Sequence, residues 1–154
     1  MGGAGVRRAR LAAIVVAPDH PWAHRQQPVA LDELARTPLI VREPGSGTRE
    51  TLDRILGRAG VEPARPLMVL DANSAVRAAV IAGLGPAVLS AITVQDELTE
   101  RRLVEVPLTG ATLRRRLHAV WAAGRPLTGS AEQLLEVALT NSPGGAPPAL
   151  SPRR

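Results

Sequence analysis

The stretch PLIVREPGSGTRETLDRILGRAG, residues 38–60, decides the fold because a buried strand leads through a glycine-rich loop into a helix. Its first four residues, 38–41, form a short apolar run typical of a buried strand. The apolar residues further on recur at helical spacing and predict one buried helix face: Leu52, Ile55, Leu56 and Ala59. Gly60 predicts the end of this helix.

The next segment repeats the same order of elements. Residues 67–70 predict a second strand, and Asn73 or Ser74 is expected to cap a second helix. The buried face of that helix is predicted from Val76, Ala79, Val80 and Gly83. Residues 87–89 predict a third strand. The order strand–helix–strand–helix–strand implies parallel βαβ units and a small three-layer lobe.

Further elements are expected on both sides of this lobe. The sequence predicts strands at 11–16, 103–106 and 113–122, and short helices at 31–35 and 93–98. A last helix is expected to begin at Thr128 or Ser130, with an apolar stripe made of Ala131, Leu134, Leu135, Ala138 and Leu139. Residues 141–154 are rich in Pro, Gly, Ala and Ser, which predicts a disordered tail.

Composition excludes several classes of function. The chain has no cysteine, so thiolate nucleophiles and zinc–thiolate sites are excluded, and its three histidines show no metal-ligand spacing. We therefore expect no metal and no cofactor. The net charge is +5, but the arginines are scattered, which favours solvated faces over a nucleic-acid surface. No segment approaches the roughly 20 apolar residues of a membrane span.

The loop REPGSGT, residues 42–48, is the first candidate site. Such a loop presents free N–H groups at a helix N-terminus, where the helix dipole favours an anion, and Ser46 and Thr48 add hydroxyl donors. A tight turn with an ordinary helix cap is an equally good interpretation of these residues. Nucleotide binding is disfavoured, because the chain has no Lys for a P-loop and Glu50 stands where the dinucleotide fingerprint needs glycine.

The loop DANSAV, residues 71–76, is the second candidate site. Asn73 and Ser74 follow the strand predicted at 67–70, and ligands of parallel sheets bind beyond the carboxyl ends of the strands. This places the two loops on the same rim, although Asn73 or Ser74 could serve only as a helix cap. No catalytic arrangement is recognisable: Ser46 has no evident His and Asp partners, and GSGTR is not a nucleophile elbow. We expect that the chain is not an enzyme.

Five segments in order resemble the effector-binding domain of LysR-type transcriptional regulators. They are VVAPDHPWA, PLIVREPGSGTRETLDRIL, DANSAVRAAVIAGLGPAVLS, RRLVEVPL and RRRLHAVWAAGRPLTGSAEQLLEVAL, and together they span roughly residues 11–140. The resemblance implies an α/β, periplasmic-binding-protein-like (type 2) effector domain, with one complete three-layer lobe and a remnant of the other. It also implies a small-molecule effector, possibly a carboxylate, bound by Ser46, Gly47, Thr48, Asn73 and Ser74.

The resemblance also implies a division of the chain. Residues 1–24 would hold the N-terminal segment and first crossover strand of lobe 1, and residues 25–112 would form lobe 2. Residues 113–140 would supply the return strand and C-terminal helix of lobe 1, followed by the disordered tail. The return strand and last helix would lack their usual sheet partners, so exposed apolar surface is expected there.

The winged helix-turn-helix of the family has no counterpart in this sequence. We therefore expect a truncated sensing domain that makes no direct DNA contact, does not enter a membrane and resides in the cytoplasm. The alternatives are a free-standing solute-binding module, or a fragment that forms homo-oligomers or pairs with full-length regulators.

Overall fold

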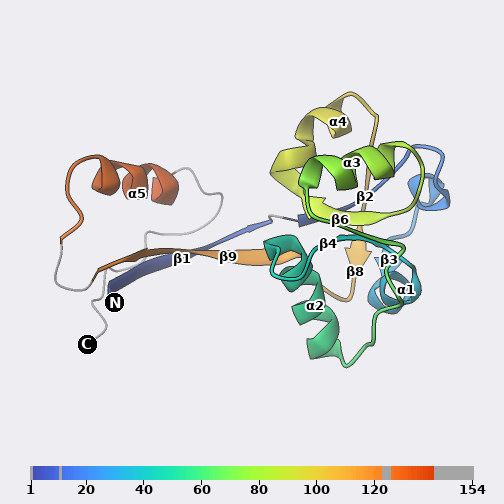
Figure 1. Cartoon of the computed structure of the whole chain (residues 1–154), viewed down its shortest axis with the longest axis horizontal. Helices are drawn as coiled ribbons and strands as arrows, with labels where there is room; N and C mark the ends of the chain where they lie inside the picture. Colours follow the sequence, from blue (N-terminus) through green and yellow to red (C-terminus); the bar gives the residue numbers. More distant parts are fainter. Residues whose placement is uncertain (1, 11, 123–125, 141–154) are drawn as a thin grey trace. The chain divides into compact units, whose positions relative to one another are not determined.

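A computed structural model describes residues 2–10, 12–122 and 126–140 (Figure 1). The chain forms two compact units, one from Arg10–Leu113 and a smaller one from the segments Met1–Ala9 and Arg114–Arg154. The disordered tail expected at 141–154 lies outside the described residues.

A five-stranded sheet forms the centre of the larger unit. Its strand order is β5-β4-β6-β2-β7, with the bounds β2 Ala12–Val16, β4 Ile40–Arg42, β5 Met68–Leu70, β6 Ala87–Ser90 and β7 Val104–Val106. Strand β4 pairs in parallel with both β5 and β6, which confirms the βαβ units predicted from the sequence. Strand β2 runs antiparallel to β6 and β7, a pairing that the sequence did not predict.

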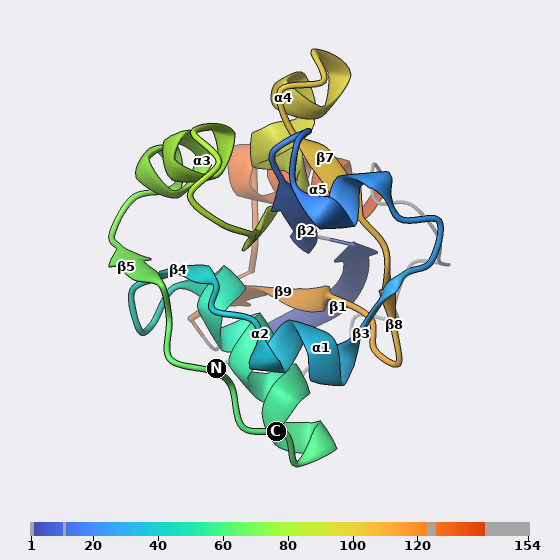
Figure 2. The same ribbon diagram turned by 90° about the vertical axis from the view of Figure 1, so that its right-hand side faces the viewer.

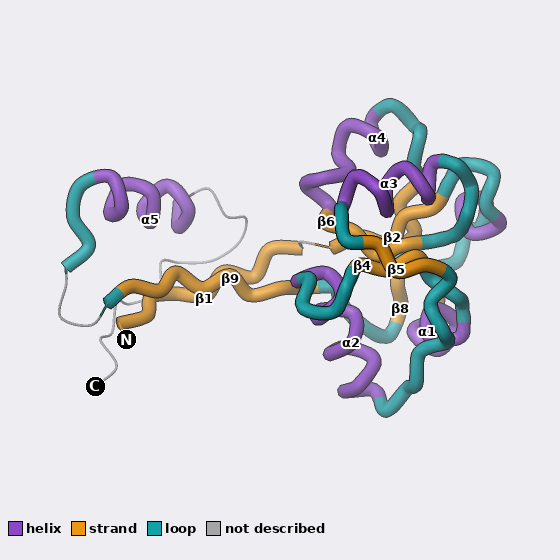
Figure 3. The backbone as a smooth tube through the Cα atoms, viewed as in Figure 1, coloured by secondary structure: helices purple, strands orange, loops and turns teal. Residues whose placement is uncertain are grey.

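Helices cover both faces of this sheet. The α-helices are α1 Leu31–Arg36, α2 Gly47–Ala59, α3 Asn73–Ile81 and α4 Gln95–Thr99, and two 3-10 helices are η1 Pro21–His24 and η2 Ala91–Val94. In Figure 2, β4 and β5 lie side by side, with α3 on one side of them and α1 and α2 on the other. The tube in Figure 3 shows the same three layers, as the sequence predicted.

Successive side chains of the strands point alternately to the two faces of the sheet and form a hydrophobic core on each face. In β2, Ala12, Ile14 and Val16 pack toward the face of α1 and α2, whereas Ala13 and Val15 pack toward the face of α3. All five are buried because successive side chains of a strand point to opposite faces and helices cover both of them. This explains why the predicted strand is a continuous apolar run.

The helix termini agree only in part with the sequence. Gly60 follows the last residue of α2 with φ 66°, a left-handed conformation that favours glycine, so the predicted helix end is confirmed. The expected cap of α3 by Asn73 or Ser74 is wrong: the N-cap is Ala72, and Asn73 is the first helical residue. The short parallel pair of β3 Val29–Ala30 and β8 Leu108–Thr109 was not predicted, because two-residue strands leave no periodic signal.

The smaller unit holds a two-stranded sheet of β1 Gly2–Arg10 and β9 Arg114–Trp121, together with helix α5 Ser130–Thr140. The sequence predicted no strand at residues 2–10, yet β1 pairs there with the return strand β9. Strand β1 has no recognisable strand pattern, because its sequence is rich in glycine and arginine. The expected exposure of apolar surface on the last helix is confirmed at Leu134 and Val137.

Candidate functional site

The two candidate loops lie side by side at one edge of the larger sheet. Strands β4 and β5 are parallel neighbours, and their carboxyl ends lead into the loops before α2 and α3. The backbone N–H of Glu43 donates a hydrogen bond to the carbonyl oxygen of Leu70 at 3.1 Å. This bond continues the strand pairing into both loops. The edge is therefore of the kind at which parallel sheets bind ligands.

Arg42, the last residue of β4, joins the two loops through its side chain. Its Nε and Nη2 atoms donate to the Glu43 carboxylate at 2.7 and 2.8 Å, and Nη2 also donates to the carbonyl oxygen of Asp71 at 3.1 Å. Its Nη1 atom donates to the side-chain oxygen of Asn73. The Arg42 side chain is only 15% exposed. Sequence reasoning missed this residue, although an arginine that ends an apolar strand beside an acid was a usable signal.

The N-terminus of α2 is open by comparison. Ser46 is the N-cap residue in an extended conformation, but its hydroxyl makes no hydrogen bond to a helix N–H. Instead, Ser46 Oγ lies 3.1 Å from Thr48 Oγ1. Within the described part of the chain, the N–H groups of Gly47 and Thr48 have no hydrogen-bond acceptor. Two hydroxyls and two N–H groups at the positive end of a helix dipole form a local environment suited to an anion.

At the N-terminus of α3, one of the two expected residues is already engaged. The side-chain oxygen of Asn73 accepts from Arg42, which leaves its NH2 group to donate to a ligand. Ser74 is exposed in the first turn of α3. The structure therefore places all five predicted residues on adjoining helix termini of the larger unit.

The charges at this edge are nearly balanced. The hydrogen bond from Arg42 lowers the pKa of the Glu43 carboxyl below its ordinary value, so this carboxylate is ionised at neutral pH. Arg42 is thus neutralised by its neighbour. On α2, Arg49 pairs with Asp53 across one helical turn at 2.9 Å. An anion at the α2 N-terminus would therefore depend mainly on N–H and hydroxyl donors.

The described residues offer neither a metal site nor a helix that could span a membrane. Residues 2–10, 12–122 and 126–140 contain no group of three or more His, Cys, Asp or Glu residues that could hold a metal ion. Among the same residues, no helix has both the length and the apolar character to cross a membrane.

Comparison with known protein families shows to which family the chain belongs. The model of the LysR substrate binding domain matches residues 11–142. The chain belongs to the LysR family. As the resemblance predicted, it is the effector-binding domain of a LysR-type regulator, matched from the β2 strand to the last helix.

The LysR relatives are named as transcriptional regulators. An uncharacterized HTH-type regulator of Mycobacterium tuberculosis is 42% identical over 139 residues, which cover 88% of this chain and 44% of that protein. The HTH-type regulator CbbR of Xanthobacter flavus is 37% identical over 124 residues, 80% of this chain and 37% of its own length. The chain therefore spans less than half the length of these relatives.

Solved LysR-type regulatory domains share the fold. The regulatory domain of Synechocystis PCC6803 CcmR, solved with 2-PG, has a TM-score of 0.72 at 24% identity, covering 90% of this chain and 67% of that one. The effector-binding domain of QuiR, solved with shikimate, has a TM-score of 0.65 at 17% identity, covering 89% and 65%. Both confirm the α/β, periplasmic-binding-protein-like type 2 fold expected from the sequence.

Proposed function

We propose that this LysR domain senses a small carboxylate effector at the N-terminus of α2, where Ser46, Gly47 and Thr48 supply the donors. The observation that carries the proposal is the pair of N–H groups at Gly47 and Thr48, which have no acceptor among residues 2–10, 12–122 and 126–140 and are flanked by two hydroxyls that face each other. A carboxylate has two acceptor oxygens, so it can accept from a hydroxyl and an N–H at the same time.

Asn73 and Ser74 supply a second, weaker set of contacts in this proposal. Arg42 orients the Asn73 amide through its oxygen, so that the NH2 group remains as a donor for a neutral oxygen of the ligand. Small polar effectors are found with related folds, since CcmR was solved with 2-PG and QuiR with shikimate. The effector of this chain would be of similar size.

The wider role follows from the family. The domain would convert effector binding into transcription regulation in the cytoplasm, acting by binding and not by catalysis. Direct contact with DNA is not part of the proposed role, because the arginines of the larger unit are dispersed, several in ion pairs with acids such as Asp53 and Glu97.

Thermal unfolding of the whole chain tests the proposal. A panel of small hydroxy and keto acids that includes shikimate should contain a ligand that raises the melting midpoint. Binding to the folded state alone adds about 2.7 kcal/mol at a hundredfold excess over Kd. The shift should disappear in Ser46→Ala/Thr48→Ala and persist in Thr99→Ala, a matched change at the far end of α4. A shift that survives Ser46→Ala/Thr48→Ala would move the site elsewhere.

Pairing with a second chain is the other part of the proposed role, either as a homo-oligomer or with a full-length regulator. Strand β5 is one edge of the larger sheet, and Met68 and Val69 of this strand, with Leu67 just before it, are about half exposed. Unprotected apolar edges are sites of strand pairing and association. Sedimentation should show association that Val69→Lys abolishes, while a monomer at all concentrations would contradict pairing between copies.

A further inference from the structure

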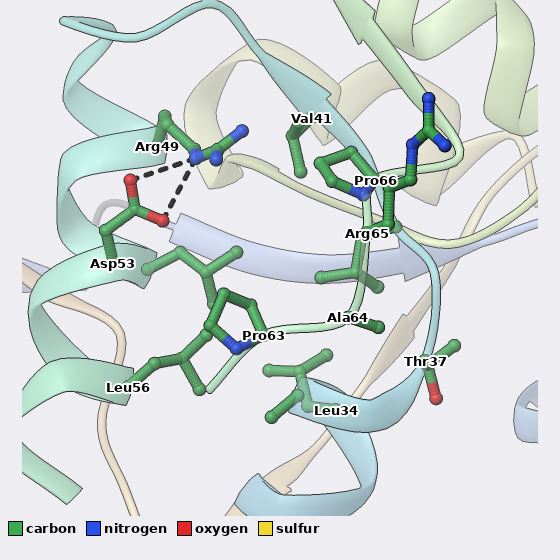
Figure 4. Close-up of a pocket in the computed structure, with 13 residues that line it drawn as sticks. Leu34, Thr37, Val41, Arg49, Asp53, Leu56, Pro63, Ala64, Arg65 and Pro66 are labelled. Atoms are coloured by element: carbon green, nitrogen blue, oxygen red, sulfur yellow. Dashed lines mark hydrogen bonds and ion pairs between the residues drawn. The ribbon is translucent and has the colours of Figure 1, made fainter. Parts of the chain in front are cut away.

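A cavity lies in the larger unit, away from the proposed effector residues. It has a volume of about 150 Å³ and is lined by residues of α1, α2, β4 and the segment 63–66 (Figure 4). None of the residues Ser46, Gly47, Thr48, Asn73 and Ser74 lines it. A ligand bound in this cavity would therefore be distinct from the proposed effector.

The floor and walls of the cavity are apolar and firmly held. Three of its lining leucines are buried: Leu34 of α1 and Leu52 and Leu56 of α2. Pro63 and Pro66 form the outer wall, and between them the Ala64 N–H donates to the Ala35 carbonyl oxygen at 2.6 Å. Prolines restrict the backbone, and this hydrogen bond fixes the segment to α1. The wall is therefore held against collapse into the space.

The mouth of the cavity carries an excess of positive charge. Arg49 donates from Nε to both oxygens of Asp53, at 3.0 and 2.9 Å, and Figure 4 shows this pair beside the opening. The Arg49 side chain is only 19% exposed, yet its two terminal nitrogens have no acceptor within the described residues. Arg65 lies on the opposite side of the mouth and has no carboxylate partner there either. The lining thus includes two arginines and one carboxylate, that of Asp53.

We propose that this cavity is a second small-molecule site, which takes a compact apolar group carrying one carboxylate. An engineered apolar cavity of about 150 Å³ takes up benzene, so the space suits one six-membered ring or a branched chain of similar volume. The ring would contact the Leu52 and Leu56 side chains. The carboxylate would accept from the unused nitrogens of Arg49, because charge-assisted hydrogen bonds to guanidinium are strong in a partly buried setting.

The probe for this site is cyclohexanecarboxylate, with cyclohexylmethanol as the neutral molecule of matching size. Calorimetric titration of the whole chain should give a Kd on the order of 1 mM for the acid, as expected for a ligand of nine heavy atoms. Nuclear Overhauser contacts should join the ring to the Leu52 and Leu56 methyl groups. The alcohol should bind about tenfold more weakly, because it cannot form the charge-assisted contact.

Variants separate the charge from the space. Arg49→Met should weaken binding of the acid about tenfold and leave binding of the alcohol unchanged. Asp53→Asn should strengthen binding of the acid, because it frees Arg49. Ala64→Phe should fill the cavity and abolish both, with retention of the fold checked by its melting curve. Arg58→Met, the same change on the exposed side of α2, is the matched control and should alter neither. Ser46→Ala/Thr48→Ala should also leave this binding intact.

Three results would overturn the proposal. One is the absence of binding by either probe up to its solubility limit. Another is equal weakening of the acid in Arg49→Met and Arg58→Met, which would indicate a general charge effect. The third is ring contacts to methyl groups that do not line the cavity. If Ala64→Phe fails to fold, the comparison of Arg49→Met with Arg58→Met still decides the outcome.

Discussion

The N-termini of α2 and α3 lie at neighbouring strand ends but use their polar groups differently. At α3, the first residue Asn73 is bound by Arg42, which also holds Glu43 and the backbone of Asp71. At α2, the Ser46 hydroxyl contacts the Thr48 hydroxyl, and the N–H groups of Gly47 and Thr48 have no acceptor among the described residues. The difference indicates that one terminus holds the two loops in place, while the other keeps donors without acceptors among the described residues, where we propose that a ligand binds.

Removal of the Arg42 side chain should have the largest effect on stability. Arg42→Met retains the apolar stem but loses four hydrogen bonds, three of them partly buried, so the free energy of unfolding should fall by about 2 kcal/mol. Urea unfolding measures this change. Arg36→Met is the matched control, because that side chain is largely exposed, and it should cost less than about 0.5 kcal/mol. Equal costs for both variants would remove the distinction between the termini.

Asn73→Ala should cost less, about 1 kcal/mol, because it removes one acceptor of Arg42. The same hydrogen bond is lost in Arg42→Met, so the double variant should be less destabilised than the sum of the single variants. A double-mutant cycle in urea gives this coupling. Strictly additive costs would show that the Arg42–Asn73 contact contributes nothing to the joining of the loops.

Ser46→Ala should have a smaller effect still. A serine N-cap typically contributes about 1 kcal/mol through a hydrogen bond to a helix N–H, and Ser46 makes no such bond. We expect a change below about 0.5 kcal/mol in the same urea experiment. A loss of 1 kcal/mol or more would mean that Ser46 caps α2 in solution, and the interpretation of this terminus as open would be wrong.

The smallest effect concerns pH. Arg42 lowers the folded-state pKa of Glu43 below its ordinary 4.5, so this stabilisation is present above pH 4.5 and is lost as pH falls through the folded pKa. The stability of Glu43→Gln should therefore fall less below pH 4.5 than that of the unchanged protein. The rest of the decline should remain in this variant, because Arg25 lowers the pKa of Glu33 in the same way. Identical acid unfolding curves for the two proteins would contradict this assignment.

Sequence reasoning predicted the parallel part of the larger unit because each element there has a local signal. Helix α2 has its apolar face and Gly60, and β4 has a continuous apolar run. The antiparallel pairing of β2 and the pairing of β1 with β9 had no such signal. Both pairings join segments far apart in the chain, and the residues of one strand do not indicate which other strand it pairs with.

Prediction of the candidate site was limited in the same way. Ser46, Gly47 and Thr48 stand out because a glycine-rich loop precedes a helix. Arg42 was missed because its importance depends on Asn73, thirty-one residues away, which becomes its neighbour only when β4 and β5 pair. The five effector residues and the domain boundaries stay predictions until a ligand is bound.

Backbone amide resonances give the most direct test of a ligand at the open terminus. The whole chain, labelled with 15N, would be titrated with the acid that raises its melting midpoint most. We predict that the Gly47 and Thr48 amide protons move downfield and saturate together, because they donate to the carboxylate, while the Arg42 side-chain resonances stay in place. A saturable response elsewhere, with Gly47 and Thr48 unchanged, would contradict the assignment of the effector site to the N-terminus of α2.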